Sequence, residues 1–167
     1  PYARVRDSLR FLRRALRGER VDQVFESFET HGFRLERAPA SLPPIYLAAL
    51  QRDMLRLAGR EGDGVLLSLV GACDVPQLAA TLGETAGGCS HELVLRVGVF
   101  ATPDAALARA HARRLIAAYL NVPAYAGLHE WLGRGDELAP LFAAWQAGDR
   151  EGAVAAISDE LVDALFV

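Results

Sequence analysis

The sequence predicts an α/β protein with a parallel sheet, because apolar runs alternate with helical stretches and the composition suits a globular protein. Apolar runs of strand length occur at residues 45–50, 65–70 and 93–100, the first of them continuous, and a stretch with helical spacing follows each run. Such runs are typical of strands covered on both faces, and connections of this length suit parallel pairing. The composition agrees, because 51% of the 167 residues are hydrophobic and 23% are charged, which is enough for one sizeable core.

The charge balance narrows the classes of partner. The net charge of −3 argues against nucleic acid or an anionic membrane as the main partner, and the arginine-rich face of residues 4–17 is better explained as a solvated face. No run of 18 uncharged apolar residues occurs, and the first residues lack the apolar core of a signal peptide. We therefore expect a cytoplasmic protein. Cys73 and Cys89 show no metal-binding spacing, so no metal site is expected.

The first forty residues predict a helix and a hairpin. Residues 4–17 place their leucines and one valine on one helical face, and Gly18 ends the helix. Residues 24–29 and 32–36 alternate in character on either side of a break at His31 and Gly32, which is typical of a small irregular hairpin.

Three strand and helix pairs follow. The run 45–50 precedes a short helix at residues 54–60 that Asp53 can cap. The run 65–70 precedes a helix opened by Asp74, with Pro76 in its first turn, where proline is tolerated. The run 93–100 precedes the clearest helix, Ala105 to Leu120.

The last part of the chain predicts further helices at residues 124–132 and 137–146, and then a fourth strand at 162–167. A parallel α/β chain of this kind suits an open doubly wound sheet or an eightfold barrel. No GxGxxG or GxxxxGK[ST] motif follows any of the strands, which weakens the nucleotide-binding open sheet. A barrel normally needs about 250 residues, so a barrel would require residues outside this chain.

Several segments resemble a known family. PIYLAAL at 44–50, MLRLAGR at 54–60 and DGVLL at 63–67 are similar to the middle of the luciferase-like monooxygenases. AAYLNVPAY at 117–125, WLGRG at 131–135 and VDALFV at 162–167 resemble the branch that depends on coenzyme F420, a deazaflavin. The resemblance covers essentially the whole chain.

The resemblance implies a partial (β/α)8 TIM-type barrel. Residues 1–167 would be the C-terminal part of a single barrel domain, with strands five to eight and extra helices before the last strand. The helix at residues 1–18 would follow strand four, and the first four strands would lie outside the chain.

Barrel enzymes place their active sites on the loops at the carboxyl ends of the strands. The functional face is therefore expected at residues 49–53, 69–74 and 101–104, and the segment 121–135, which contains His129 and Trp131, is expected at the opposite face.

The loop after the first of these strands is the expected cofactor contact. It joins a strand end to a helix amino terminus, where free N–H groups and the helix dipole favour anions. In the family the equivalent loop helps to hold the cofactor phosphate, and Arg52 can add an ion pair. Plain helix capping is the open alternative. The predicted cofactor-binding residues are Ala48, Ala49, Leu50, Gln51, Arg52, Asp53 and Met54.

The end of the next strand is the expected substrate contact. Ser68, Leu69 and Val70 would face the pocket, and Gly71 and Ala72 would leave room beside them. A small-residue turn before a helix is the open alternative.

The resemblance implies an oxidoreductase that uses reduced coenzyme F420, or alternatively FMN, for hydride transfer to a small organic substrate or for its monooxygenation. A homodimer is expected. The catalytic residues would lie largely in the absent first half, so none is named. A non-catalytic flavin-binding or structural paralogue is the alternative, because the loop Gln51-Arg52-Asp53 lacks the glycine that is common in related chains.

Overall fold

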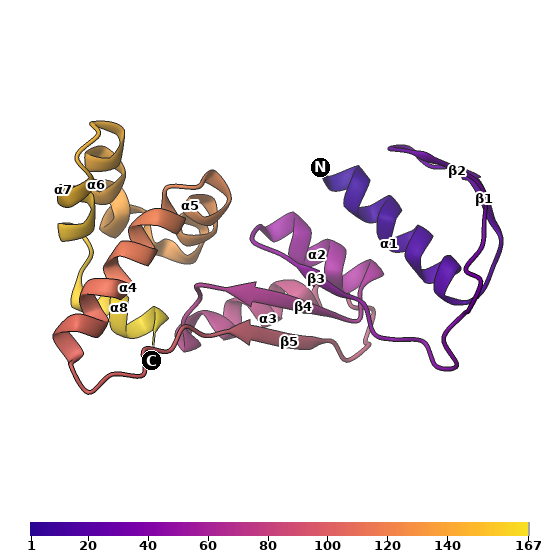
Figure 1. Ribbon diagram of the computed structural model, residues 1–167, viewed down its shortest axis with the longest axis horizontal. Helices are drawn as coiled ribbons and strands as arrows, with labels where there is room; N and C mark the ends of the chain where they lie inside the picture. The colour runs from indigo at the N-terminus through magenta and orange to yellow at the C-terminus, as the bar shows by residue number, and fades with distance from the viewer. Residues whose placement is uncertain (167) are drawn as a thin grey trace.

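The computed structural model describes residues 1–166 and contains a three-stranded parallel sheet (Figure 1). The strands β3 (Tyr46–Ala48), β4 (Gly64–Ser68) and β5 (Glu92–Arg96) lie in sequence order. Leu47 is paired with Val65, which is paired with Leu93. Because both pairings are parallel, the carboxyl ends of the three strands meet at one edge of the sheet, called here the carboxyl edge.

Two helices cover one face of this sheet. Helix α2 (Arg52–Glu61) joins β3 to β4, and the short 3-10 turn η1 (Ala72–Asp74) leads from β4 into α3 (Val75–Gly83). The first hydrophobic core lies between these layers, and its fully or almost fully buried members include Leu55, Leu57, Val65, Leu67 and Leu78. Side chains alternate between the two faces along each strand, so every second strand residue points into this core, as the apolar runs predict.

The other face of the sheet is open and partly apolar. The register places Ala48, Leu66 and Val94 side by side on this face, and Leu66 and Val94 are 41% and 38% exposed. Tyr46 lies across Gly64, where an added Cβ would approach its ring to 2.5 Å. Large apolar side chains in a row on an uncovered sheet face need a covering layer.

The N-terminal segment contains the predicted helix and a hairpin, but the predicted break at His31 and Gly32 is wrong, because both residues lie inside the second strand and the turn falls at residues 25–28. Helix α1 (Tyr2–Leu16) is followed by the antiparallel strands β1 (Val21–Val24) and β2 (Glu29–Phe33). Phe11 of α1 makes edge-to-face contacts with Phe25, Phe28 and Phe33, which fasten the hairpin to the helix.

Residues 105–165 form a second unit, called here the helical lobe. It consists of α4 (Ala105–Leu120), α5 (Pro123–His129), the π-helical turn η2 (Glu130–Arg134), α6 (Gly135–Gln146), α7 (Arg150–Ala155) and α8 (Asp159–Leu165). Helix α4 has the predicted bounds, because Asp104 accepts a hydrogen bond from the Leu107 N–H at 3.0 Å and caps it.

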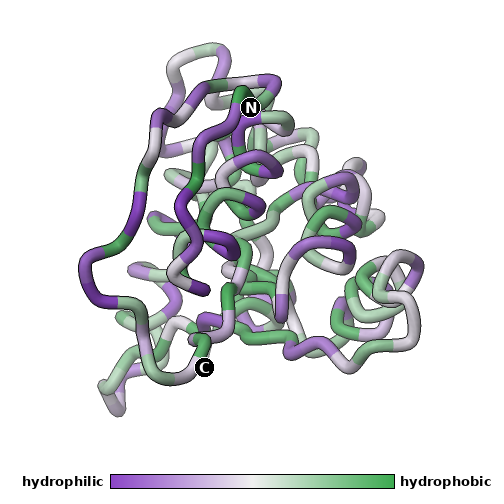
Figure 2. Tube along the Cα trace, turned by 90° about the vertical axis from the view of Figure 1, so that its right-hand side faces the viewer, coloured by the Kyte–Doolittle hydropathy of each residue, from purple (hydrophilic) through white to green (hydrophobic). Residues whose placement is uncertain are grey.

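Most of the helical lobe surrounds a second core, in which Ile116, Leu120, Leu138, Leu141 and Leu161 are buried. Leu128 of α5 is instead buried in the first core. Figure 1 shows the lobe beyond the arrowheads of β4 and β5. Figure 2 shows hydrophilic and hydrophobic residues alternating over short distances along the chain, as amphipathic elements require.

The predicted fourth strand at residues 162–167 is wrong. Residues 162–165 belong to α8, and among the described residues Phe166 makes one isolated parallel bridge, to Gly98. Ser158 caps the helix through the Leu161 N–H at 3.0 Å, and Asp159 and Glu160 occupy its first turn, where acidic groups favour a helix. Val167 lies outside the described residues.

Gly59 of α2 lies against the end of α3 and the residues that follow it. A Cβ at this position would lie 2.5 Å from both the Leu82 carbonyl oxygen and Thr85 Oγ1. We expect Gly59→Ala to lower the free energy of unfolding by about 1–3 kcal/mol, because backbone has to move. Urea unfolding of the purified protein measures this change.

The matched control is Gly83→Ala in α3, where an added Cβ has nothing within 4 Å. This substitution should leave stability unchanged or raise it by up to about 1 kcal/mol. Equal effects of the two substitutions would contradict the close packing of α2 on α3.

Candidate functional site at the carboxyl edge

The helical lobe packs on the carboxyl edge, which corrects one expectation. The segment 121–135 was expected at the opposite face, yet Gln77 Nε2 donates to the Trp131 carbonyl at 3.2 Å and Arg134 contacts Asp74 in the loop after β4. The expectation assumed that α4 returns along the sheet, as a barrel helix does. Instead α4 packs within the helical core, so the chain that follows it stays at the carboxyl edge.

A buried ion pair joins the two units. Arg134 Nη2 lies 2.8 Å and 3.0 Å from the two carboxylate oxygens of Asp74, whose side chain is 6% exposed, against 12% for that of Arg134. Asp74 also accepts the Gly71 N–H at 2.7 Å. Asp74 does precede α3, as predicted, but its carboxylate binds Gly71 and Arg134 and makes no capping bond to that helix.

His129 completes this arrangement, and with Asp74 and Arg134 it is called here the buried polar cluster. Its imidazole is fully buried, and Nδ1 lies 3.5 Å from Arg134 Nη1. Burial and the positive charge of Arg134 lower the pKa of His129 to about 4; the Leu69 backbone and Asp74 act in the opposite direction and do not offset them. The ring is therefore neutral at pH 7, and within residues 1–166 its Nε2 has no hydrogen-bond partner.

The loop after β4 is held from two sides. Leu69 has a φ of 57°, a left-handed conformation that costs a non-glycine residue about 1–3 kcal/mol. Gly71 approaches α8 so closely that an added Cβ would lie 2.6 Å from the Ala164 carbonyl oxygen. The missing side chain of Gly71 therefore admits α8, whereas the sequence suggested that it leaves room for a substrate.

A cavity of about 160 Å³ lies between the sheet and the helical lobe and is called here the edge pocket. Its walls come from β4, β5, the loop after β5, α4 and the end of the lobe. The lining residues are Ser68, Leu69, Arg96, Gly98, Val99, Phe100, Leu115, Tyr119, Leu165 and Phe166.

Only two of the three predicted substrate residues line the edge pocket. Ser68 and Leu69 line the edge pocket, whereas Val70 is buried with the first hydrophobic core. Arg96 and Tyr119 were missed. Arg96 had a visible signal, since it is the single charged residue within the apolar run 93–100.

The predicted cofactor loop lies at the same edge. Ala48 ends β3 on the open face, and the Ala49 N–H donates to the Leu66 carbonyl at 3.3 Å. Leu50 and Met54 are partly buried against the first core. Gln51 is the residue that precedes α2, and its side chain makes no capping bond.

The two charged residues of this loop are engaged elsewhere. Arg52 Nη2 lies 3.7 Å from a Glu84 carboxylate oxygen. The predicted capping role of Asp53 is wrong, because Asp53 lies inside the first turn, is 80% exposed and pairs with Arg56 at 3.6 Å. No residue from 48 to 54 has a positive φ, so this loop adopts its conformation without a glycine.

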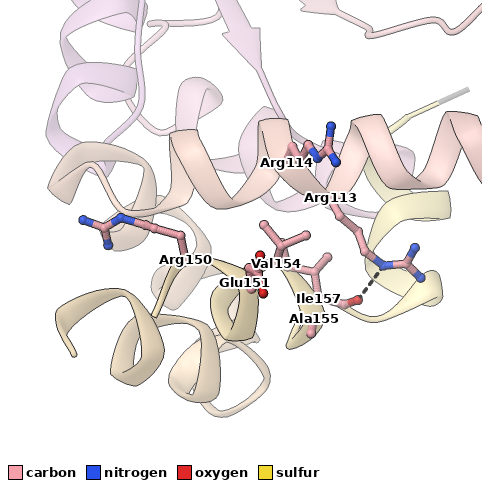
Figure 3. Close-up of a pocket in the computed structure, with 7 residues that line it drawn as sticks. All are labelled: Arg113, Arg114, Arg150, Glu151, Val154, Ala155 and Ile157. Atoms are coloured by element: carbon pink, nitrogen blue, oxygen red, sulfur yellow. Dashed lines mark hydrogen bonds between the residues drawn. The ribbon is translucent and has the colours of Figure 1, made fainter. Parts of the chain in front are cut away.

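A larger groove lies within the helical lobe, between α4 and α7 (Figure 3). It has a volume of about 750 Å³ and is lined in part by Arg113, Arg114 and Arg150. Arg113 donates to the Ile157 carbonyl at 3.0 Å, and Arg150 lies over the Trp145 ring at 3.8 Å. No sheet or carboxyl-edge residue lines this groove, so the edge pocket is the better candidate site.

Two further findings concern residues 1–166. No three histidine, cysteine or acidic side chains in this range are grouped as metal ligands would be. No helix there is both long enough and apolar enough to cross a membrane.

The buried polar cluster predicts a loss of stability in acid. A histidine whose pKa falls from 6.5 to about 4 on folding binds its proton more readily in the unfolded chain. Its contribution to stability is therefore complete above pH 6.5 and is lost as the pH falls toward 4, by up to about 3 kcal/mol. We expect His129→Gln to reduce this dependence in urea unfolding between pH 7.5 and 4.5. The control is His31→Gln, which changes an exposed imidazole and should leave the pH dependence of the free energy of unfolding as in the wild type. If His129→Gln also left this pH dependence unchanged, the neutral buried ring would be contradicted.

Sequence comparison finds a methylenetetrahydromethanopterin reductase and several F420-dependent dehydrogenases among the relatives of this chain. The chain is 27% identical over 173 residues to a 5,10-methylenetetrahydromethanopterin reductase of Archaeoglobus fulgidus, which covers 98% of the chain and 52% of that protein. It is 40% identical over 65 residues to an F420-dependent glucose-6-phosphate dehydrogenase of Mycolicibacterium gilvum, which covers 39% of the chain and 19% of that protein. The chain thus spans about half the length of the reductase and matches a smaller part of the dehydrogenase.

Structural comparison supports the same fold. The coenzyme F420-dependent tetrahydromethanopterin reductase of Methanopyrus kandleri superposes with a TM-score of 0.73 at 19% identity, covering 100% of this chain and 50% of that one. An F420-dependent secondary alcohol dehydrogenase superposes with a TM-score of 0.64 at 16% identity, covering 96% and 46%.

The model of one family matches the whole chain. Its description is luciferase-like monooxygenase, and the match runs over residues 1–167. The resemblance inferred from the sequence is thereby confirmed, and the chain belongs to the luciferase-like monooxygenase family.

Proposed function

We propose that the protein is an F420-dependent oxidoreductase that transfers a hydride to or from a small organic substrate. The observation that carries the proposal is the edge pocket, which opens beside the carboxyl ends of parallel strands, where enzymes of this architecture bind their ligands. The names of the glucose-6-phosphate dehydrogenase relative and of both structural neighbours state a dependence on F420, which supports the choice of this cofactor.

We also propose that residues 1–167 are the C-terminal part of one barrel domain. Leu66 and Val94 stand on an open sheet face that a barrel would fill with side chains of its other strands. The three parallel strands would then be barrel strands five to seven, and the absent strands would cover this face. The coverage of about half of the superposed reductase supports this assignment.

The cofactor would be held by the loop of residues 48–54. The amino terminus of α2 presents its first N–H groups beside Gln51, and that residue brings no capping group of its own. Such a terminus favours an anionic group such as a phosphate. Asp53 does not block this end, because its carboxylate is exposed and paired with Arg56. When bound, reduced coenzyme F420 supplies the hydride, and the protein supplies binding and orientation.

The edge pocket would hold the substrate. Leu69, Phe100 and Phe166 give it apolar walls that exclude water from the reacting groups. Ser68 adds a hydroxyl at the end of β4. The strained conformation of Leu69 supports a functional role for this loop, since strained residues gather at binding sites.

FMN is the alternative cofactor, because it too carries a phosphate group that the loop of residues 48–54 could bind. The non-catalytic paralogue stays the alternative, and the absence of a positive φ at residues 48–54 shows only that the loop needs no glycine for its own conformation. A homodimer and a cytoplasmic location stay predictions.

We expect the full-length protein that contains this chain to bind coenzyme F420, measured by titration of the cofactor's fluorescence. Gln51→Glu should weaken F420 binding about tenfold or more, because it places a carboxylate next to the phosphate of the cofactor. The substitution should not destabilise α2, because acidic groups are favourable at a helix amino terminus.

Gln51→Ala is the control at the same position, and its affinity should stay within about twofold of the wild type. Failure to bind either F420 or FMN would overturn the proposed function. Equal affinities of the Glu and Ala variants would overturn the assignment of the phosphate to this loop.

A further inference from the structure

We propose that Arg96 makes the edge pocket a site for a small organic anion, so that the substrate carries a carboxylate or phosphate group next to an apolar body. This inference rests on the proposed function, and it adds the chemical class of the substrate.

The sheet register places Arg96 at the pocket. It is the last residue of β5 and is paired with Ser68, the last residue of β4. Side chains alternate along a strand, so both residues belong to the open face at the carboxyl edge. Both line the edge pocket, and Tyr119 of α4 lines it as well.

These three polar side chains have no partner in the described protein. Within residues 1–166, the Arg96 guanidinium and the Ser68 and Tyr119 hydroxyls make no hydrogen bond, and Arg96 makes no ion pair. Arg109 and Arg134 of the lobe are paired, with Asp163 at 2.9 Å and with Asp74, whereas the exposed Arg114 resembles Arg96 in having no partner within residues 1–166. Free polar groups that converge on one cavity are the usual means of fixing a ligand.

The donors favour an anion. A guanidinium has donors and no acceptor, and each hydroxyl offers one donor. Among residues 1–166, no carboxylate side chain lines the pocket. Arginine binds carboxylates and phosphates through two parallel hydrogen bonds, which fixes the orientation of the bound group.

The rest of the pocket suits an apolar body. Phe100, Leu115, Leu165 and Phe166 form its walls. Arg96 itself is exposed, so it would bind an anion mainly through the paired hydrogen bonds of its guanidinium, while these walls contact the apolar body. The volume of about 160 Å³ restricts the occupant to a small molecule.

The test uses the full-length protein that contains this chain, with benzoate and benzyl alcohol as probes. They share an apolar ring and differ in the anionic group. Isothermal titration calorimetry measures both affinities, with and without saturating F420. We expect benzoate to bind about tenfold or more tightly than benzyl alcohol, since hydrogen bonds to a charged group favour it. Arg96→Gln should reduce this preference to within about twofold, and Arg96→Lys should retain part of it.

Arg114→Gln is the matched control, because it removes the same charge from an exposed residue of α4 in the groove of Figure 3. It should keep the wild-type preference. Thermal unfolding checks that each variant is folded, and the exposed position of Arg96 predicts a small effect on stability.

The outcomes distinguish an anionic group of the substrate from an anionic group of the cofactor. Loss of the benzoate preference in Arg96→Gln with unchanged F420 affinity supports the proposal. A preference that persists in Arg96→Gln, or no benzoate preference in the wild type, overturns it. A selective loss of F420 affinity in Arg96→Gln also overturns it, because the anion would then belong to the cofactor. A protein that binds benzoate through Arg96 but binds no F420 would contradict the proposed function and leave this inference standing.

Discussion

The ion pair between Asp74 and Arg134 joins the sheet to the helical lobe, together with Leu128 of α5, which is buried in the first hydrophobic core. The two residues lie 60 positions apart and both side chains are largely buried. Removal of one partner from such a pair leaves an uncompensated charge, at a typical cost of about 3–5 kcal/mol. Because Asp74 also binds the Gly71 N–H, the pair holds the loop after β4 and the turn η2 together.

This junction creates the candidate site. The edge pocket has walls from both units, with Ser68 and Arg96 on the sheet and Leu115 and Tyr119 on the lobe. Burial at this junction and the charge of Arg134 keep His129 neutral, and Leu69 of the adjoining loop has a left-handed conformation. A site built at the meeting of two packed units excludes water and orients its polar groups, which is what a hydride transfer requires of the protein.

Local patterns predicted the local structure well. Helix α4 has its expected bounds because its signals lie within its own sequence, including the Asp104 cap. Residues 162–167 misled because valine and phenylalanine suit a strand, whereas Ser158 and the apolar spacing of α8 favour a helix. The barrel rule placed Ser68 and Leu69 correctly at the carboxyl edge.

The tertiary arrangement was beyond sequence reasoning. The position of residues 121–135 depends on contacts such as that between Gln77 and the Trp131 carbonyl, which no local pattern reveals. The same holds for Tyr119, whose role depends on where α4 packs. Arg96 could have been predicted as a site residue, because a single charged residue within an apolar strand conflicts with the local pattern and such conflicts are expected at functional sites.

The most direct test of this account is a double-mutant cycle at the junction. The free energy of unfolding is measured for the wild type, Asp74→Asn, Arg134→Met and the double variant at neutral pH. A buried pair that docks the lobe predicts a coupling free energy of about 2 kcal/mol or more. A coupling below about 0.5 kcal/mol, the range of additive sites, would contradict it.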